Sequence, residues 1–343
     1  MVFGKLLYNK FIRIIQKDGE IPVNTKESLS NKYSPDRKIK DGLRRLNRYK
    51  LLYLMLLPGL TVILLIYYLP MFGVIIAFKN INYQLGIFKS PWVGLDNFKY
   101  LFSSDNAWIM TRNTIAYNGF FIVSGLIISV GMALMLNELK KKLAAKVYQT
   151  IILAPYFLSM VVVGYLVFAM LGEESGFLNT HLLPSLGMKP INWYRDSKLW
   201  VMILPIVQIW KSSGYGTVIY LAAIAGVDKE LLEAAKIDGA NRWKQIWHVT
   251  LPTIRPVMIV MTFMSIAKIF YSDFGLFYNV PMNTGMLIPT TQVIDTFVYR
   301  SLIGMGNIGM SAAASFYQSM VGFILVLFSN KIIKKVDPES AMF

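Results

Sequence analysis

Hydrophobic residues gather in six long blocks along the chain, and the segments between them carry most of the charges. A helix needs about 20 apolar residues to cross the hydrocarbon core of a membrane, and every block reaches that length. The pattern predicts six membrane-spanning helices, over residues 51–78, 114–136, 148–171, 199–226, 255–280 and 311–333.

The first block, 51–78, has no charged residue in 28 positions. Pro58 and Pro70 lie inside it, and proline is tolerated in membrane helices because neighbouring helices and local adjustments satisfy the freed carbonyl groups. A cleaved signal peptide is the competing interpretation. Fifty residues precede this block, it is too long for a signal peptide, and no small-residue cleavage pattern follows it. We therefore expect it to remain as a helix.

The composition supports the same class of protein. Hydrophobic residues make up 55% of the 343 positions and charged residues 16%, which favours a membrane protein over soluble domains. The chain has no cysteine, which excludes disulfides and thiolate metal sites. The expected fold is an all-α polytopic membrane protein, with an N-terminal segment at 1–50, a membrane domain at 51–333 and a tail at 334–343.

The net charge of +16 is explained by the distribution of the basic residues. Of the 35 Lys and Arg residues, 25 lie in or next to segments that share a side with the N-terminus. Eight lie in the other connecting segments, and Lys211 and Lys268 lie inside predicted spans. The positive-inside rule then predicts a multi-pass protein of the cytoplasmic membrane with both termini in the cytoplasm. Nucleic acid is not needed to explain the charge.

The N-terminal segment divides into an amphipathic start and a basic end. Apolar residues recur at helical spacing over 1–17, with four basic residues between them. This pattern fits a helix on the membrane surface and, equally well, a helix packed on protein. The basic run at 37–50 is expected to hold the first span against anionic lipid.

The segment 227–254 interrupts the apolar blocks with the sequence "LLEAAKIDGANRWKQIWHVTLP" near its centre. Asp228 is placed to cap a short helix and Gly239 to end it in a left-handed conformation. Asn241 can cap a second helix. The spacing predicts two short helices that meet at the glycine.

The first of these helices has one small, smooth side. Leu231, Ala234 and Ala235 fall on one face, and Glu233 lies at its edge. Small residues allow the backbone of another protein to come close, and a carboxylate at the rim can pair with an arginine across an interface. From the spacing alone, a docking element and an ordinary connecting loop are equally good interpretations.

The string "EAAKIDGANRWKQIWHVTLP" resembles the cytoplasmic "EAA" loop of permease subunits in binding-protein-dependent ATP-binding-cassette importers. Twenty consecutive positions match, with Gly239 and Leu251-Pro252 in register. The segments "WVGLDNFKYLF", "NTIAYNGFF" and "DFGLFYNVPMNTGMLIPTTQVIDTFVYR" are also similar, so the resemblance runs from about residue 50 to the C-terminus. Within the family the chain is most similar to carbohydrate permeases that serve oligosaccharides released from polysaccharides.

The resemblance implies a type I importer permease fold in which this loop is a coupling helix seated in a groove of a cytoplasmic ATPase. It implies that Glu233 pairs with the ATPase, that Ala234 and Ala235 form the close-approach surface, and that Trp243 and Trp247 anchor the loop to the bundle. The implied coupling set is Glu233, Ala234, Ala235, Asp238, Gly239, Trp243 and Trp247. The family's usual Gly-Gly-Pro and threonine pattern is replaced here by "NVPMNTGMLIPTT", which leaves the identity of the cargo open.

Several chemistries have no residues to support them. No G-x-x-x-x-G-K-[ST] string is present, so ATP and Mg are expected to be bound by partner ATPase subunits and no cofactor by this chain. His181 and His248 fall on opposite sides of the membrane in the predicted topology, which removes a zinc site or a catalytic triad. Glu173 and Glu174 are expected on a solvated face. An enzymatic role is not expected.

Polar residues inside spans indicate where a passage runs, because a charge at the bilayer centre costs about 2.5 to 3.5 kcal/mol and so faces the bundle or water. The fourth and fifth predicted spans carry most of them. For the lysines the competing interpretation is snorkelling, and for the aromatic residues it is packing. The predicted pathway residues are Trp210, Lys211, Tyr215, Lys268, Tyr271, Asp273, Phe274 and Tyr278.

One docking loop per chain requires a second permease subunit, since an ATPase pair needs two. We expect a heterodimer, two cytoplasmic ATPase subunits and an external or periplasmic solute-binding protein, with an oligosaccharide as cargo. Two alternatives stay open. One is a permease for amino acids, peptides or metal, and the other is a non-transporting membrane scaffold that holds a cytoplasmic partner through the same loop.

Overall fold

The computed structural model describes residues 49–336. This part is helical, and its sole strand-like feature is an isolated bridge between Lys79 and Trp92. The predictions for the amphipathic start and most of the basic run, and for the tail from 337 on, lie outside the described residues.

The chain divides at Phe72 into two units. The described part of the first unit begins with α4 (Lys50–Ile63) and continues through a π-helical turn, η1 (Leu64–Tyr68). The following 3-10 helix, η2 (Leu69–Phe78), extends across the division. Pro58 lies inside α4 without ending it, and the helical run Lys50–Phe78 is apolar enough to cross a membrane. The prediction of a helix over the first block is confirmed.

The second unit is built around α7 (Asp105–Asn137) and α11 (Ser197–Ala225), which pack against each other more extensively than any other pair of described helices. Before α7 come α5 (Gly86–Lys89) and α6 (Asp96–Phe102). The last helix, α18 (Ile308–Val336), contains the sixth predicted span. The predicted spans at 114–136, 199–226 and 311–333 therefore correspond to long helices.

The predicted third span, 148–171, is not one continuous helix. It consists of α8 (Lys142–Leu153), a 3-10 turn η3 (Ala154–Phe157) and α9 (Met160–Leu171), and the two arms are bent by 99°. Leu158 is extended, and the side chain of Ser159 caps the next helix by accepting from the Val162 amide at 3.3 Å. Pro155 near the bend favours the break because proline cannot donate a backbone hydrogen bond.

The predicted fifth span, 255–280, is also interrupted. The helix α14 (Leu251–Ile266) ends early, and α15 (Phe274–Asn279) begins after a non-helical stretch at 267–273. The side chain of Asp273 caps α15 by accepting from the Leu276 amide at 3.2 Å. A cap inside an apolar block starts a new helix, which is why hydropathy alone placed the end of the span too late.

The remaining elements are short and lie in the connecting segments. They are η4 (Leu178–Leu182), α10 (Leu183–Ser185), α12 (Lys229–Ile237), α13 (Arg242–Gln245), η5 (Ile246–Thr250), η6 (Gly285–Leu287), α16 (Ile288–Thr291), α17 (Ile294–Tyr299) and η7 (Arg300–Gly304).

Length and composition identify four helical stretches of the described chain that can cross a membrane, or five if the bent pair α8 and α9 counts as one span. These stretches include α7, α18 and the run through α14, but not α11. With 29 residues α11 is long enough to cross. The count of six spans stays a prediction.

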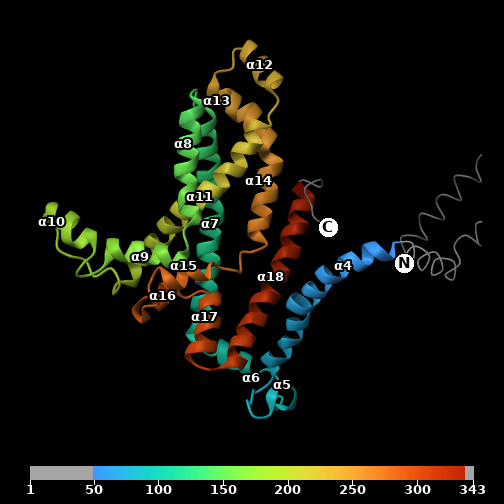
Figure 1. Cartoon of the computed structure of the whole chain (residues 1–343). Coiled ribbons are helices and arrows are strands. Elements are labelled where there is room, and N and C mark those ends of the chain that lie inside the picture. Colours follow the sequence, from blue (N-terminus) through green and yellow to red (C-terminus); the bar gives the residue numbers. More distant parts are fainter. Residues whose placement is uncertain (1–48, 337–343) are drawn as a thin grey trace, which may run out of the picture. The chain divides into compact units, whose positions relative to one another are not determined.

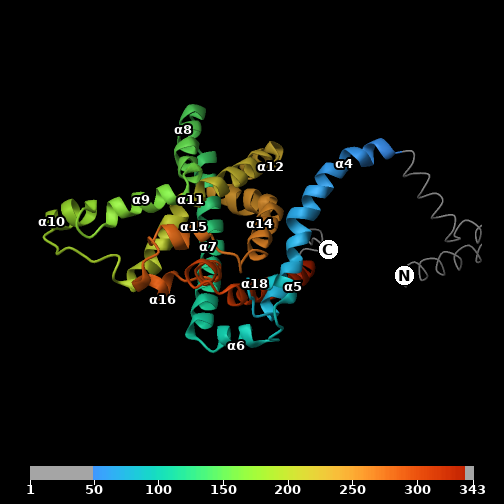
Figure 2. The ribbon, with the colours of Figure 1, turned by 60° about the horizontal axis from the view of Figure 1, so that its bottom comes forward.

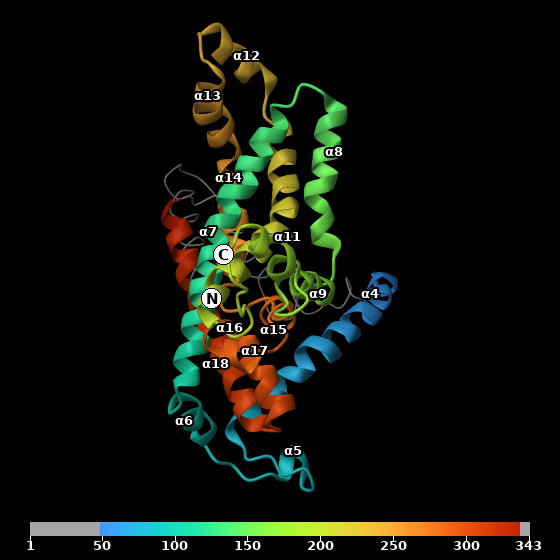
Figure 3. The ribbon, with the colours of Figure 1, turned by 90° about the vertical axis from the view of Figure 1, so that its left-hand side faces the viewer.

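Within the second unit, α12 and α13 lie at one end of the long helices and α6 at the other (Figures 1 and 3). The arm formed by α9 and α10 projects sideways from α7 and α11 (Figure 2). The short helices of segment 227–254 and the connecting segment before α7 are thus at opposite ends, as the predicted topology requires.

Three groups of buried apolar residues hold the second unit together. One lies between α7, α9, α11 and α15, a second between α6, α7, α17 and α18, and the third beneath α12, between α7, α11 and α14. Backbones come very close at Gly214 of α11, where an added Cβ would overlap the carbonyl oxygen of Ile152 in α8. Glycine at this position lets the two helices touch.

Candidate coupling site and transport pathway

The helix α12 begins as its sequence predicts. Asp228 has an extended backbone, and its carboxylate accepts a hydrogen bond from the Glu230 amide at 2.9 Å. Glu230 lies in the first turn, where a negative charge interacts favourably with the helix dipole.

The end of α12 is a Schellman motif. Gly239 has a φ of +79°, its amide donates to the Lys236 carbonyl at 3.1 Å, and the Ala240 amide donates to the Ala235 carbonyl at 2.9 Å. An added Cβ at Gly239 would meet open space, so the positive φ, and not crowding, is what requires glycine. The predicted left-handed turn is confirmed.

The second short helix, α13, is capped by Asn241, whose side chain accepts from the Lys244 amide at 2.9 Å. The predicted cap is therefore confirmed. The predicted anchoring of the loop to the bundle by Trp243 and Trp247 stays a prediction, and these side chains are 71% and 63% exposed. Gln245 is buried, and its side-chain amide donates to the Ala240 carbonyl at 2.8 Å.

The outer surface of this region is open and partly apolar. Glu233, Ala234 and Asp238 are exposed and Ala235 is half-buried, while Ile237 is 87% exposed. On the other side of α12, Leu232 packs on the buried group beneath it. Exposed apolar side chains of this size on a short helix are typical of a surface that another protein covers.

Lys211 has a structural role that the sequence did not indicate. Its ammonium group donates to the carbonyl oxygens of Leu158 at 2.7 Å, Tyr156 at 3.0 Å and Pro155 at 3.5 Å. These carbonyl groups lie at the break between α8 and α9, and that of Pro155 also accepts from the Leu158 amide at 3.2 Å. The structure places Lys211 against the broken helix, where its donors are engaged.

The other predicted pathway residues of α11 do not form one group. The ring of Tyr215 stacks on that of Tyr156, with centroids 4.8 Å apart. Trp210 lies among apolar residues of α9 and α11, which include Val163 and Ile206. The structure therefore separates Trp210 from the Tyr215 and Lys211 pair.

Two of the predicted pathway residues of the fifth block, Phe274 and Tyr278, pack against each other. The rings of Phe274 and Tyr278 stack with centroids 4.8 Å apart. The ring centroid of Tyr299 in α17 lies 4.9 Å from that of Phe274 and 5.1 Å from that of Tyr278. Lys268 and Tyr271 are exposed in the interruption before α15. Asp273 acts as the cap of α15, a structural role that sequence reasoning missed.

A polar network closes the interruption of the fifth block, and the sequence did not predict it. Asn118 of α7 donates to the Ser272 hydroxyl at 3.0 Å, and Gln318 of α18 donates to the Phe270 carbonyl at 2.6 Å. Asp295 of α17 accepts from the Ser272 amide at 2.8 Å and from Gln318 at 3.1 Å. Residues distant in sequence thus satisfy the backbone where the helix stops.

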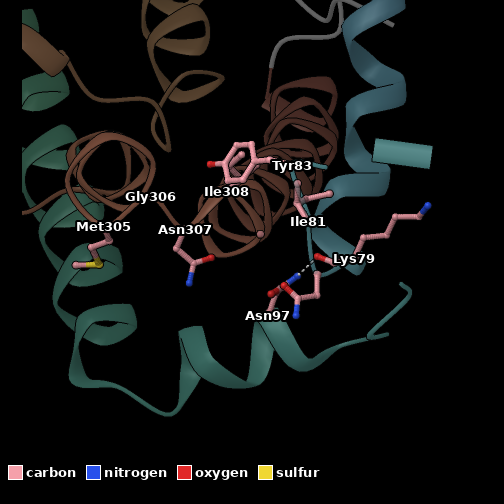
Figure 4. Close-up of a pocket in the computed structure, with 10 residues that line it drawn as sticks. Lys79, Ile81, Tyr83, Asn97, Met305, Gly306, Asn307 and Ile308 are labelled. Atoms are coloured by element: carbon pink, nitrogen blue, oxygen red, sulfur yellow. Dashed lines mark hydrogen bonds between the residues drawn. The ribbon is translucent and has the colours of Figure 1, made fainter. Parts of the chain in front are cut away.

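A polar cavity of about 300 Å³ lies at the end opposite α12, between the segment after η2, α6 and the start of α18 (Figure 4). Two of its polar side chains, those of Asn97 and Lys79, are engaged by backbone carbonyl groups. Asn97 donates to the carbonyl oxygens of Ala77 at 2.9 Å and Lys79 at 3.0 Å, while the Lys79 ammonium donates to the Phe88 carbonyl at 2.7 Å. These hydrogen bonds tie the start of α6 to the end of η2 and the segment after it.

Candidate metal ligands are not grouped. Among residues 49–336 no three His, Asp or Glu side chains lie close enough to share a metal ion. His181 contacts Thr180 and His248 contacts the Lys244 carbonyl, and the two residues lie in separate connecting segments.

The sequence of residues 125–337 matches the model of the family described as "binding-protein-dependent transport system inner membrane component". The chain belongs to this family. The matched range includes the loop with α12 and α13, as well as every predicted pathway residue. Membership confirms the expected resemblance and makes the chain a membrane permease of a binding-protein-dependent transport system.

Relatives of the permease cover most of its length. It is 37% identical to protein LplB of Bacillus subtilis (strain 168) over 86% of this chain and 92% of that one. It is also 37% identical to YteP of the same organism, a polygalacturonan/rhamnogalacturonan transport system permease protein, over 88% and 93% of the two chains.

Solved structures show the same fold. The permease superimposes with a TM-score of 0.79 and 30% identity on a chain of a bacterial ABC transporter that imports the acidic polysaccharide alginate, covering 86% of this chain and 99% of that one. A second structure, with a TM-score of 0.77 and 30% identity, shows the alginate transporter in complex with a periplasmic protein that holds an alginate pentasaccharide; it covers 85% of this chain and 97% of that one. The predicted type I importer permease fold is confirmed.

Proposed function

We propose that this permease is one transmembrane subunit of an ATP-driven importer that moves an oligosaccharide, released from a polysaccharide, into the cell by alternating access. The observation that supports this proposal most directly is the exposed surface of α12. An apolar and carboxylate-bearing helix, fixed by caps at both ends, stands at the tip of the long helices, where a motor protein can push it.

In this proposal α12 docks in a groove of a cytoplasmic ATPase. The Glu233 carboxylate pairs with an arginine of the ATPase, and Ala234 and Ala235 allow close approach. Trp243 and Trp247, which this chain leaves exposed, and Ile237 add apolar surface to the same interface. Gly239 keeps the two short helices at a fixed angle, so that movement of α12 reaches α11 and α14.

The oligosaccharide cargo is supported by the relatives. YteP and the alginate transporter are both named for polysaccharides. The aromatic residues of α15 and α17 supply ring faces and hydroxyl groups that suit a sugar.

The assembly in this proposal consists of this chain and four other subunits. Two cytoplasmic ATPase subunits bind ATP and Mg, a second homologous permease completes the passage, and a solute-binding protein delivers the sugar from outside. Both termini of this chain and the loop at 227–254 face the cytoplasm, as the basic residues favour.

The test is ATP-dependent uptake of labelled oligosaccharide into proteoliposomes that hold the full transporter. Glu233→Ala combined with Gly239→Pro should abolish uptake while the bundle stays inserted, because proline cannot adopt a positive φ. The matched controls are Gly239→Asn, which tolerates the left-handed conformation, and Glu174→Ala at an exposed carboxylate of another segment; both should keep uptake. Unchanged uptake in the double variant, or no ATP-dependent uptake of any solute by the wild type, would contradict the proposal. The second result would favour a scaffold.

A further inference from the structure

Arg300 is the one charged residue of the described chain whose shielded side-chain nitrogens lack a hydrogen-bond partner. It begins η7, directly after α17, and its two terminal nitrogens, Nη1 and Nη2, are shielded from solvent without a hydrogen-bond partner. None of the ion pairs among residues 49–336 includes it. A guanidinium keeps its charge at physiological pH, and a buried charge without a partner is costly. Nη1 and Nη2 therefore have no hydrogen-bond acceptor among the described residues.

The other edge of this guanidinium is held in place. The Nε of Arg300 donates to the side-chain oxygen of Asn283 at 2.9 Å, and the amide nitrogen of Asn283 lies 3.3 Å from the Tyr278 hydroxyl, to which it donates. The guanidinium carbon lies 6.0 Å from the ring centroid of Tyr278. Fixing Nε leaves Nη1 and Nη2 as a two-pronged donor, and a carboxylate accepts two parallel hydrogen bonds from such a fork.

An aromatic surface adjoins this fork. Tyr278, which neighbours the guanidinium, belongs to the cluster with Phe274 and Tyr299, and α15 and α17 contact each other (Figure 3). Ring faces of this kind suit a pyranose ring. A cation beside an aromatic surface therefore favours an anion carried on a sugar ring over a small anion without one.

The turn that carries Asn283 is strained. Met282 and Asn283 have φ values of 53° and 48°, although neither is glycine, and such conformations persist where the surrounding structure enforces them. The turn is closed by the backbone amide of Asn283, which donates to the backbone carbonyl of Tyr278 at 3.0 Å. It lies within "NVPMNTG", where the sequence departs from the pattern of the family it resembles. Because Nη1 and Nη2 are shielded from solvent, a ligand can reach them only after a local movement.

We propose that Arg300 binds the carboxylate of an acidic sugar residue in the transported oligosaccharide, with Tyr278 beside it and Asn283 holding the guanidinium in position. The inference rests on the proposed function and narrows it, from oligosaccharides in general to uronate-containing ones. Arg300 then acts as a specificity-determining residue of this permease.

The experiment uses the complete transporter with its solute-binding protein in proteoliposomes. ATP-dependent uptake of trigalacturonate, an acidic trimer, is compared with uptake of maltotriose, an uncharged trimer, and with uptake of sn-glycerol 3-phosphate. The variants are Arg300→Gln and Arg300→Lys, and the matched control is Arg195→Gln, which removes an exposed arginine that pairs with Glu173 at 3.4 Å. Thermal stability and ATPase activity of each assembly are measured in parallel.

We expect the wild type to import trigalacturonate, and Arg300→Gln to lower that uptake about tenfold or more through a higher half-saturation concentration, as a missing polar contact does. Trigalacturonate uptake by Arg300→Lys should lie between that of the wild type and that of Arg300→Gln. Uptake by Arg195→Gln should match the wild type, and the thermal stability of the assembly should be unchanged in all variants. Three results would overturn the inference. They are unchanged trigalacturonate uptake in Arg300→Gln, a fall in its uptake that is accompanied by a loss of thermal stability, and a wild type that imports only maltotriose or glycerol phosphate. Import of maltotriose alone leaves the proposed function standing, whereas a wild type that imports no saccharide overturns both.

Discussion

Lys211 shows how a single side chain can hold a broken helix inside an apolar bundle. Its ammonium group reaches three carbonyl oxygens, of Pro155, Tyr156 and Leu158, and its charge lies 5.8 Å from the ring centroid of Tyr156. Unsatisfied backbone acceptors are costly in a medium without water, so this lysine adds to the local hydrogen bonds that stabilise the 99° bend.

Replacing this lysine tests the role directly. Lys211→Met keeps the length of the side chain and removes all three donors, and we expect the assembled transporter to lose about 1–3 kcal/mol of stability, the cost of leaving buried acceptors unsatisfied. Thermal unfolding of the purified assembly measures the loss. Lys211→Arg retains donors and should lose less, and equal stability of Lys211→Met and the wild type would show that water or another group replaces the ammonium.

At the level of elements, the predictable features are those with local causes. Asp228, Gly239 and Asn241 were assigned from sequence because caps and left-handed turns depend on residues a few positions apart. The breaks inside the third and fifth blocks were missed. Their carbonyl groups are satisfied by partners far along the chain, such as Asn118, which donates to the Ile269 carbonyl 151 positions away at 2.7 Å.

Close contact between helices gives a second prediction. In Gly214→Ala the new methyl group would overlap the Ile152 carbonyl, so α11 and α8 must separate. We expect a loss of about 1–3 kcal/mol from overpacking, seen as a lower thermal midpoint of the assembly. The control is Gly131→Ala in α7, where an added Cβ meets open space. Alanine there should leave stability unchanged or raise it slightly through helix propensity, and equal midpoints for the two variants would contradict the close approach.

At the scale of the whole permease, the apolar blocks predicted the helical fold class, while the pathway stays a prediction whose residues do not all lie together. Phe274 and Tyr278 meet in one cluster with Tyr299, but Trp210 lies elsewhere. Spacing along one block does not show which face of a helix meets a distant one. Tyr299 and Arg300 lie outside the blocks, so the spacing within a block gave no reason to place them beside Tyr278.

The sidedness of the permease can be measured because the chain has no cysteine. Single cysteines at Lys229 of α12 and Lys99 of α6, both exposed, lie at opposite ends of the second unit (Figure 1). In intact cells a membrane-impermeant maleimide should label the Lys99→Cys variant and reach the Lys229→Cys variant only after the membrane is broken. Labelling of Lys229→Cys in intact cells would place α12 outside and would exclude contact with a cytoplasmic ATPase.

Contact between α12 and the ATPase can be measured directly by cross-linking. Ile237→Cys places a thiol at the exposed tip of α12, and a short bifunctional cross-linker is applied to the purified transporter, with Lys99→Cys as the control. We expect a cross-link from position 237 to the ATPase subunit, with a yield that changes when ATP is bound, and none from position 99. An assembly that contains the ATPase but gives no cross-link from position 237 in any nucleotide state would contradict this contact.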